Sequence, residues 1–144
     1  MSDNNINPTI LLEAVRDILI NDSILSGASY LNGTGKIFTR RKPNNQTGQY
    51  LVIECKDIPS SGIAQFSTEV RVFCYTALLT NGQIAPLGDL ILFRCQEVLN
   101  DQQIVVVGLS TISMITTIVP SFLDETDPSR ARGVLRIKID FVNN

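Results

Sequence analysis

Apolar residues recur at helical spacing in two stretches of the chain. In the first stretch, "PTILLEAVRDILI", they lie three and four positions apart, and Asn7 followed by Pro8 suits the start of a helix. The second stretch carries an apolar stripe of Leu87, Leu90, Ile91, Val98 and Leu99. We therefore expect one helix that begins at residue 8 and ends near Asn21, and a second helix over 87–100.

Polar and apolar residues alternate in most of the remaining chain, which predicts β-strands. The turn sequences "NNQTG" and "PSSG" separate the early strands, and runs of β-branched residues mark the late ones. We expect the first two strands to form a hairpin whose tip carries a basic run. The expected strands are 36–41, 50–56, 65–76, 104–108, 110–119 and 134–141.

This order of elements, α-β-β-β-α-β-β-β, predicts an α+β fold. Short turns join antiparallel neighbours, so we expect an antiparallel β-sheet of about five to six strands with two helices packed on one face. The chain has 144 residues, which suits a single domain over 1–144, and its polar residues 1–7 are expected to be a flexible N-terminus.

Several strands are apolar on both faces. Val52 precedes Ile53, and Phe73 and Tyr75 flank Cys74. Two helices can cover one face of the sheet, so the second face needs another cover. A partner subunit would supply it, or the loop over 20–35 would fold across that face.

Composition narrows the class of protein. Apolar residues make up 44% of the chain and charged residues 18%, which indicates a globular rather than a disordered protein. The net charge of −2 argues against attraction of the whole protein to a polyanion. The polar start "MSDNNINP" lacks the pattern of an export signal, and the three cysteines form no C-x-x-C pair. We expect a reduced, cytosolic chain that does not enter a membrane.

The sequence offers no constellation for catalysis. Histidine is absent, so the commonest general base and metal ligand is missing. Gly35-Lys36 is followed by Ile37, where a phosphate-binding P-loop needs Ser or Thr. "GLSTI" lacks the second glycine of a nucleophile elbow. We expect no catalytic, cofactor-binding or metal-binding residues, and no enzyme activity.

Two short segments concentrate charge. A basic run follows the glycine-rich turn at 32–35, and "DETDPSRAR" mixes carboxylates with arginines. Acid on one copy could meet base on the next, or both segments could be solvated loops; the pattern is compatible with either. The candidate assembly residues are Lys36, Arg40, Arg41, Lys42, Asp124, Glu125, Asp127, Arg130 and Arg132.

The chain as a whole resembles the small tail-terminator (tail-completion, head–tail joining) proteins of long-tailed bacteriophages. The resemblance rests on chain length and on the order of "PTILLEAVRDILINDSILSG", "GQYLVIECKD", "TEVRVFCYT", "GDLILFRCQEVLN" and "ARGVLRIKIDF". It implies a structural virion protein and no cofactor.

The resemblance also implies a mechanism and partners. Such proteins form a ring, here expected to be a hexamer, that caps the tail tube, stops tail polymerisation and provides the head-attachment surface. The expected partners are other copies of the chain, the tail tube protein and a head-closure or connector protein, with DNA only passing through the ring. The expected location is the virion tail or neck, after assembly in the host cytoplasm. A head-closure or connector ring is the nearest alternative, and a small α+β ligand-binding domain or enzyme is a more distant one.

Overall fold

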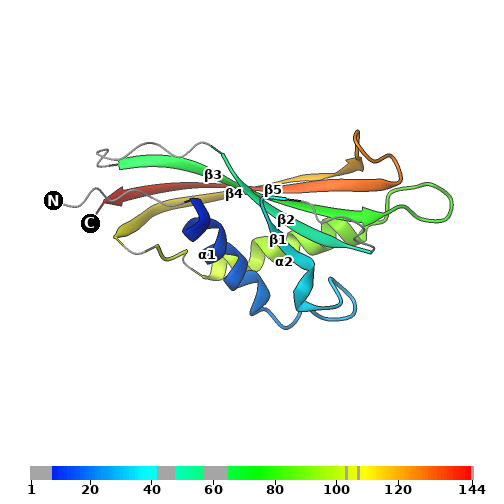
Figure 1. Cartoon of the computed structure of the whole chain (residues 1–144), viewed down its shortest axis with the longest axis horizontal. Coiled ribbons are helices and arrows are strands. Elements are labelled where there is room, and N and C mark those ends of the chain that lie inside the picture. The colour runs from blue at the N-terminus through cyan, green and yellow to red at the C-terminus, as the bar shows by residue number, and fades with distance from the viewer. Residues whose placement is uncertain (1–7, 42–47, 57–64, 103, 107, 144) are drawn as a thin grey trace.

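The computed structural model describes residues 8–41, 48–56, 65–102, 104–106 and 108–143. These ranges leave out residues 1–7, Lys42 and most of the two turn sequences. The expected flexible N-terminus therefore falls outside the described residues. Within the described residues the chain forms two α-helices and five strands (Figure 1). The elements are α1 (Pro8–Ile20), β1 (Ile37–Thr39), β2 (Tyr50–Cys55), β3 (Gln65–Ala77), α2 (Leu87–Asp101), β4 (Leu109–Leu123) and β5 (Arg130–Asn143), with a short 3-10 helix at Thr34–Lys36.

The α+β class is confirmed, but the sheet is mixed rather than antiparallel. Its strand order is β1-β2-β3-β5-β4, and β1 pairs with β2 in parallel, with Ile37 opposite Leu51. The expected hairpin with a charged tip is therefore wrong. The chain leaves β1 at Arg40, which has a positive φ of 66° and donates its backbone N–H to the carbonyl of Ile53 at 2.7 Å. Parallel neighbours cannot be joined by a tight turn, so β1 and β2 are not the two arms of one hairpin.

Two strands follow α2, where three were expected. The described residues 104–106 are not in a strand, although Ile104 and Val106 are buried in the core. β4 instead continues through Pro120, which was expected to end it. β4 is an edge strand, where proline removes no ladder hydrogen bond. Its pairing with β5 is irregular there, with a register shift between Val119 and Phe122.

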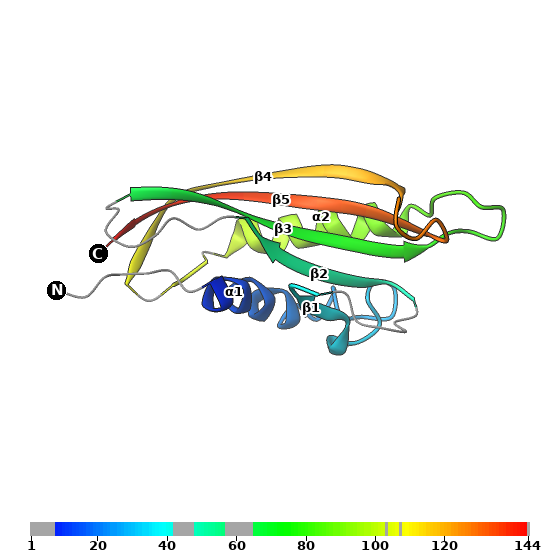
Figure 2. The ribbon, with the colours of Figure 1, turned by 45° about the horizontal axis from the view of Figure 1, so that its top comes forward.

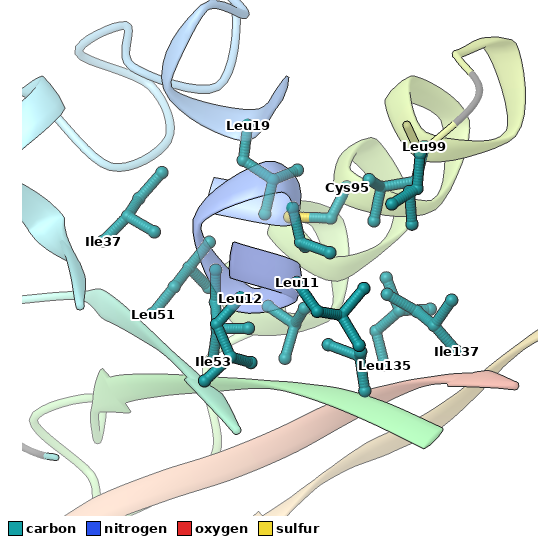
Figure 3. Close-up of a cluster of buried hydrophobic side chains, with 14 of the residues drawn as sticks. Leu11, Leu12, Leu19, Ile37, Leu51, Ile53, Cys95, Leu99, Leu135 and Ile137 are labelled. Carbon is teal, nitrogen blue, oxygen red and sulfur yellow. The ribbon is translucent and has the colours of Figure 1, made fainter. Parts of the chain in front are cut away.

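Both helices pack on one face of the sheet, as expected (Figure 2). The apolar stripes of α1 and α2 meet alternate residues of the strands and form a buried core (Figure 3). It includes Leu11, Leu12 and Leu19 of α1, Cys95 and Leu99 of α2, and Ile37, Leu51, Ile53, Leu135 and Ile137 of the strands. Leu90 is an exception: it was expected in the inner stripe of α2, but it is 54% exposed and is no part of this core.

The segment between α1 and β1 lies on the helix side of the sheet. Leu25 and Leu31 are buried in the same core, and Asp22 forms an ion pair with Arg94 of α2 at 2.7 Å. The hydrogen bonds from Arg94 hold the pKa of Asp22 below its ordinary value, although partial burial opposes the shift. The loop over 20–35 therefore does not cover the second face of the sheet, and that alternative is wrong.

Candidate assembly surface

The second face of the sheet points away from both helices (Figure 2). On β3, β5 and β4, no described helix lies across it. We call the side chains that these three strands and Lys56 present there the open face. Pairing places Tyr75 opposite Arg132, Phe73 opposite Val134, and Glu69 opposite Lys138. The open face therefore changes along the strands from aromatic and apolar side chains, with Arg130 and Arg132 beside them, to a half of charged side chains.

The aromatic half contains two rows of stacked groups, and the first row extends to Tyr50 of the neighbouring strand β2, which is itself buried. Tyr50 of β2 stacks on Tyr75 with ring centroids 5.0 Å apart, and the Arg130 guanidinium lies 5.3 Å above the Tyr50 ring. Arg132 lies 5.1 Å above the ring of Phe73. Partial burial raises the pKa of Tyr75, and a hydrogen bond from Arg132 opposes that rise. These contacts hold both arginines against the sheet, so their charge is fixed in place.

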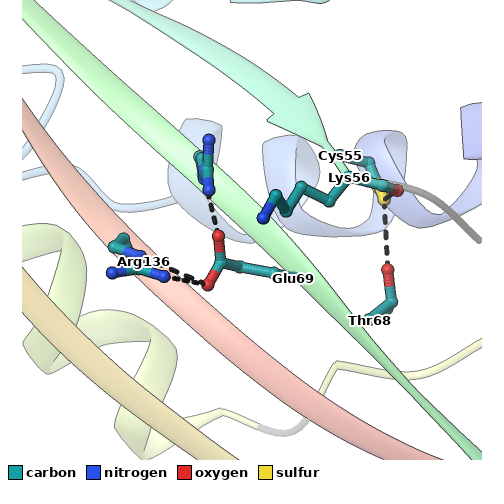
Figure 4. Close-up of polar contacts among 6 residues, drawn as sticks. Cys55, Lys56, Thr68, Glu69 and Arg136 are labelled. Carbon is teal, nitrogen blue, oxygen red and sulfur yellow. Dashed lines mark hydrogen bonds and ion pairs between the residues drawn. The ribbon is translucent and has the colours of Figure 1, made fainter.

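The charged half is organised around Glu69. Its carboxylate accepts hydrogen bonds from Arg71 at 2.6 Å and from Arg136 at 2.9 Å (Figure 4). Burial would raise the pKa of Glu69, but the hydrogen bonds and charges of the two arginines outweigh it and lower the pKa. Glu69 therefore stays ionised and orients both guanidinium groups.

A shallow, open basin of about 370 Å³ lies beside this ion pair. Lys56 and Lys138 line it together with Ser67, Glu69 and Arg136. Both lysine side chains are exposed. The basin presents ammonium groups to solvent with one carboxylate beneath them, which suits an acidic surface.

A second carboxylate of the open face, Asp140, lies farther along β5. It accepts hydrogen bonds from Ser113 of β4 at 2.6 Å and from Ser67 of β3. These two hydroxyl groups lower the pKa of Asp140. The hydrogen bonds join the three long strands across the open face.

The charges of the outward-facing side chains are unequal. Across β2, β3 and β5 with Lys56, six basic side chains oppose three acidic ones, although the whole chain has a net charge of −2. The basic ones are Lys56, Arg71, Arg130, Arg132, Arg136 and Lys138, and the acidic ones are Glu54, Glu69 and Asp140.

The basic run predicted as an assembly contact is divided by the fold. Lys36 precedes β1, and its Nζ lies 3.9 Å from the position that a Cβ on Gly48 would take. Arg40 and Arg41 are exposed at the other end of β1, where Arg40 donates a hydrogen bond to the hydroxyl of Thr9 in α1 at 2.7 Å. Lys42 lies outside the described residues.

In the acidic loop, Asp124 and Asp127 form hydrogen bonds and an ion pair with neighbouring residues of the same loop. Asp124 is buried, and its Oδ1 accepts hydrogen bonds from the backbone and hydroxyl of Thr126. Asp127 lies 3.6 Å from Arg130, and Glu125 is exposed. Asp124 is therefore buried within its own turn in the single chain.

Within one chain, the basic run and the acidic loop meet only in part. Arg130 donates to the carbonyl of Gly48 at 2.8 Å, which brings it near Lys36. Arg40 and Arg41 lie beyond the opposite end of β1, beside the first turn of α1. Arg130 and Arg132 belong to the open face.

Two of the three cysteines lie where reagents cannot reach them, and Cys55 is half-buried. Cys74 and Cys95 are free thiols inside the core, and burial raises the pKa of both. No group of three or more acidic or cysteine side chains that could hold a metal ion occurs in the described ranges. Nor is any helix there long and apolar enough to cross a membrane.

Four basic residues of this surface were not among the candidates predicted from the sequence: Lys56, Arg71, Arg136 and Lys138. Their signal was present, because Arg136 and Lys138 alternate with buried residues on one strand. A search for dense runs of charge overlooks basic residues that are spaced two apart and gathered by strand pairing.

No family model matches the chain, and no curated protein matches it either.

Proposed function

We propose that the chain is a phage tail terminator, a subunit of a ring that caps the tail tube and offers a surface for head attachment. The observation that carries the proposal is the open face, which is partly apolar, mainly basic and crossed by no described helix. An uncovered apolar and charged surface of this kind suits a protein that works by binding other surfaces. The resemblance in length and order of elements names the class of assembly.

The size of the open face supports a stable contact. The three long strands have 13 to 15 residues each. They span about 45 Å by 14 Å, or roughly 650 Å² for one partner. A partner that covered this area fully with a surface of its own would bury about 1,300 Å² in total, which lies within the range of specific protein interfaces.

The proposed work is recognition without a reaction. A ring of identical subunits needs a head-to-tail contact that repeats around one axis. The ring then presents one rim to the tube end and the other to the head. Arg40 and Arg41 remain proposed assembly contacts, and reversing both charges should weaken assembly while leaving the monomer folded.

The direct test is native mass spectrometry with negative-stain imaging across a range of protein concentrations. The protein is also mixed with tubes assembled from the cognate tail tube protein. Closed rings and density that caps the tube ends are expected. Rings that ignore tube ends but bind the head connector would favour the head-closure alternative. A monomer at every concentration that also ignores tubes would refute the proposal.

A further inference from the structure

One stripe of α2 resembles the open face in its order of residue types. Leu90, Phe93, Glu97 and Asp101 lie at positions i, i+3, i+7 and i+11, which share one side of a helix. The apolar pair is exposed, at 54% and 53%, and both acids are exposed as well. We call these four residues the α2 strip. Its first half is apolar and its second half is acidic.

The α2 strip and the open face run in the same direction. Asp89, next to Leu90, accepts hydrogen bonds from Ser121 at the β4 irregularity, near the aromatic half of the open face. Farther along α2, Gln96 donates to Thr116, which pairs with Ile137 beside the charged half. The apolar pair of the α2 strip therefore lies beneath the aromatic half of the open face, and its acidic pair lies beneath the charged half.

The spacings also agree. The middle of the apolar pair is about 11 Å from the middle of the acidic pair at 1.5 Å per helical residue. On the sheet, four residues separate the Phe73–Val134 pair from the Glu69–Lys138 pair. Four strand residues span about 13 Å. A second copy that stacks its helix side on the open face, with its strands in the same direction, would place apolar groups on aromatic rings and acids on lysines.

We propose that the open face of one copy packs on the α2 strip of the next copy. The occupant of the open face is thus a second copy of this chain, chosen by charge complementarity and by matched spacing. The contact joins two different surfaces, so it repeats head-to-tail and closes into a ring where the rotation permits. This inference rests on the proposed function, because it names the contact that would build the proposed ring.

The test is a charge exchange between the two surfaces. The sheet variant carries Lys56→Glu and Lys138→Glu, and neither lysine belongs to the ion pairs of Glu69. The helix variant carries Glu97→Lys and Asp101→Lys. Each variant alone places like charges on both surfaces and should raise the dissociation constant of self-association about tenfold or more.

Mixing the two variants should restore the oligomer. Each sheet variant then meets a helix variant, so native mass spectrometry with one variant isotope-labelled should find alternating complexes. All four substitutions in one chain should also restore self-association. A matched control, Glu13→Lys with Asp17→Lys, changes the same charges at the same spacing on exposed positions of α1. It should keep its self-association.

The outcomes separate this inference from the proposed function. Wild-type rings that neither variant weakens, or variants that the mixture fails to restore, would overturn the inference and leave the terminator proposal standing. Restored rings that never bind tube ends would support the inference and overturn the terminator proposal. A wild-type chain that stays monomeric overturns both. Circular dichroism of each variant distinguishes a lost contact from a lost fold.

Discussion

Gly133 of β5 is a point of close approach between β4, β5 and α2, and Gly133→Ala should destabilise the protein. A Cβ at this position would lie 2.7 Å from Ser121 Oγ and 2.8 Å from Leu92 Cδ1. Contacts this short force the neighbours to move. Ser121 can move little, because Asp89 accepts hydrogen bonds from both its backbone N–H and its hydroxyl at 2.8 Å.

The cost follows from two opposing effects. Overpacking in a filled region typically costs about 1–3 kcal/mol. Replacing glycine by alanine also restricts the unfolded chain, which returns about 0.4–1 kcal/mol. We therefore expect a net loss of about 1–2 kcal/mol and a Tm lower by about 3–7 °C for a domain of this size.

Urea unfolding followed by circular dichroism, at one protein concentration, measures this loss. Gly35→Ala is the matched control, because nothing lies within 4 Å of its added Cβ. It should keep only the gain from the restricted unfolded chain and stabilise the protein by about 0.4–1 kcal/mol. In a Ser121→Ala background, Gly133→Ala should cost less, since the shortest contact is gone. An unchanged midpoint for Gly133→Ala would refute the close packing of the β4 irregularity on β5.

Two further predictions concern ionisable groups. Asp22→Asn should lower the free energy of unfolding at pH 7 by about 1 kcal/mol or less, because it breaks the partly exposed ion pair with Arg94. The folded pKa of Asp22 lies below its ordinary value of 3.8, so the pair stabilises above that value and is lost as the pH falls. Urea curves of wild type and variant should thus converge as the pH falls below the folded pKa of Asp22, and a constant gap would contradict this. Ellman's reagent should modify the half-buried Cys55 in the native protein, whereas Cys74 and Cys95 should react only after unfolding; fast native reaction of all three would contradict their burial.

Periodicity alone predicted the elements that carry a strong repeat. Both helices and the strand over 65–77 lie where the spacing of apolar residues placed them, within one or two residues at each end. Burial of one face fixes the position of each element. The spacing of apolar residues along the sequence identifies that face. The same logic explains why the two helices lie on one side of the sheet.

The alternation of polar and apolar residues did not predict whether neighbouring strands are parallel, or where some strands end. β1 has three residues, and alternation over so short a stretch carries no information on whether its neighbour is parallel. Proline at 120 is a sound stop signal for a central strand. It fails here because β4 is at the edge and because Asp89 of α2 accepts the hydrogen bond of Ser121, which the irregular ladder leaves unpaired. Both facts depend on partners that are distant in sequence.

The candidate surface shows why a net charge is a weak guide to binding. The chain is slightly acidic as a whole. This net charge argues against binding of the whole protein to a polyanion, and it gives no other information on binding. The fold separates the charges: strand alternation sends Arg136 and Lys138 to one side of the sheet, and helical spacing sends Glu97 and Asp101 to the other. The sequence predicts each charge pattern separately. It does not predict how the acidic residues of α2 lie relative to the basic residues of the sheet, because that depends on how α2 packs beneath the strands, with its acidic end under the basic half. That relation allows one chain to carry two complementary surfaces, and such a chain can bind its own copies although its total charge is nearly balanced.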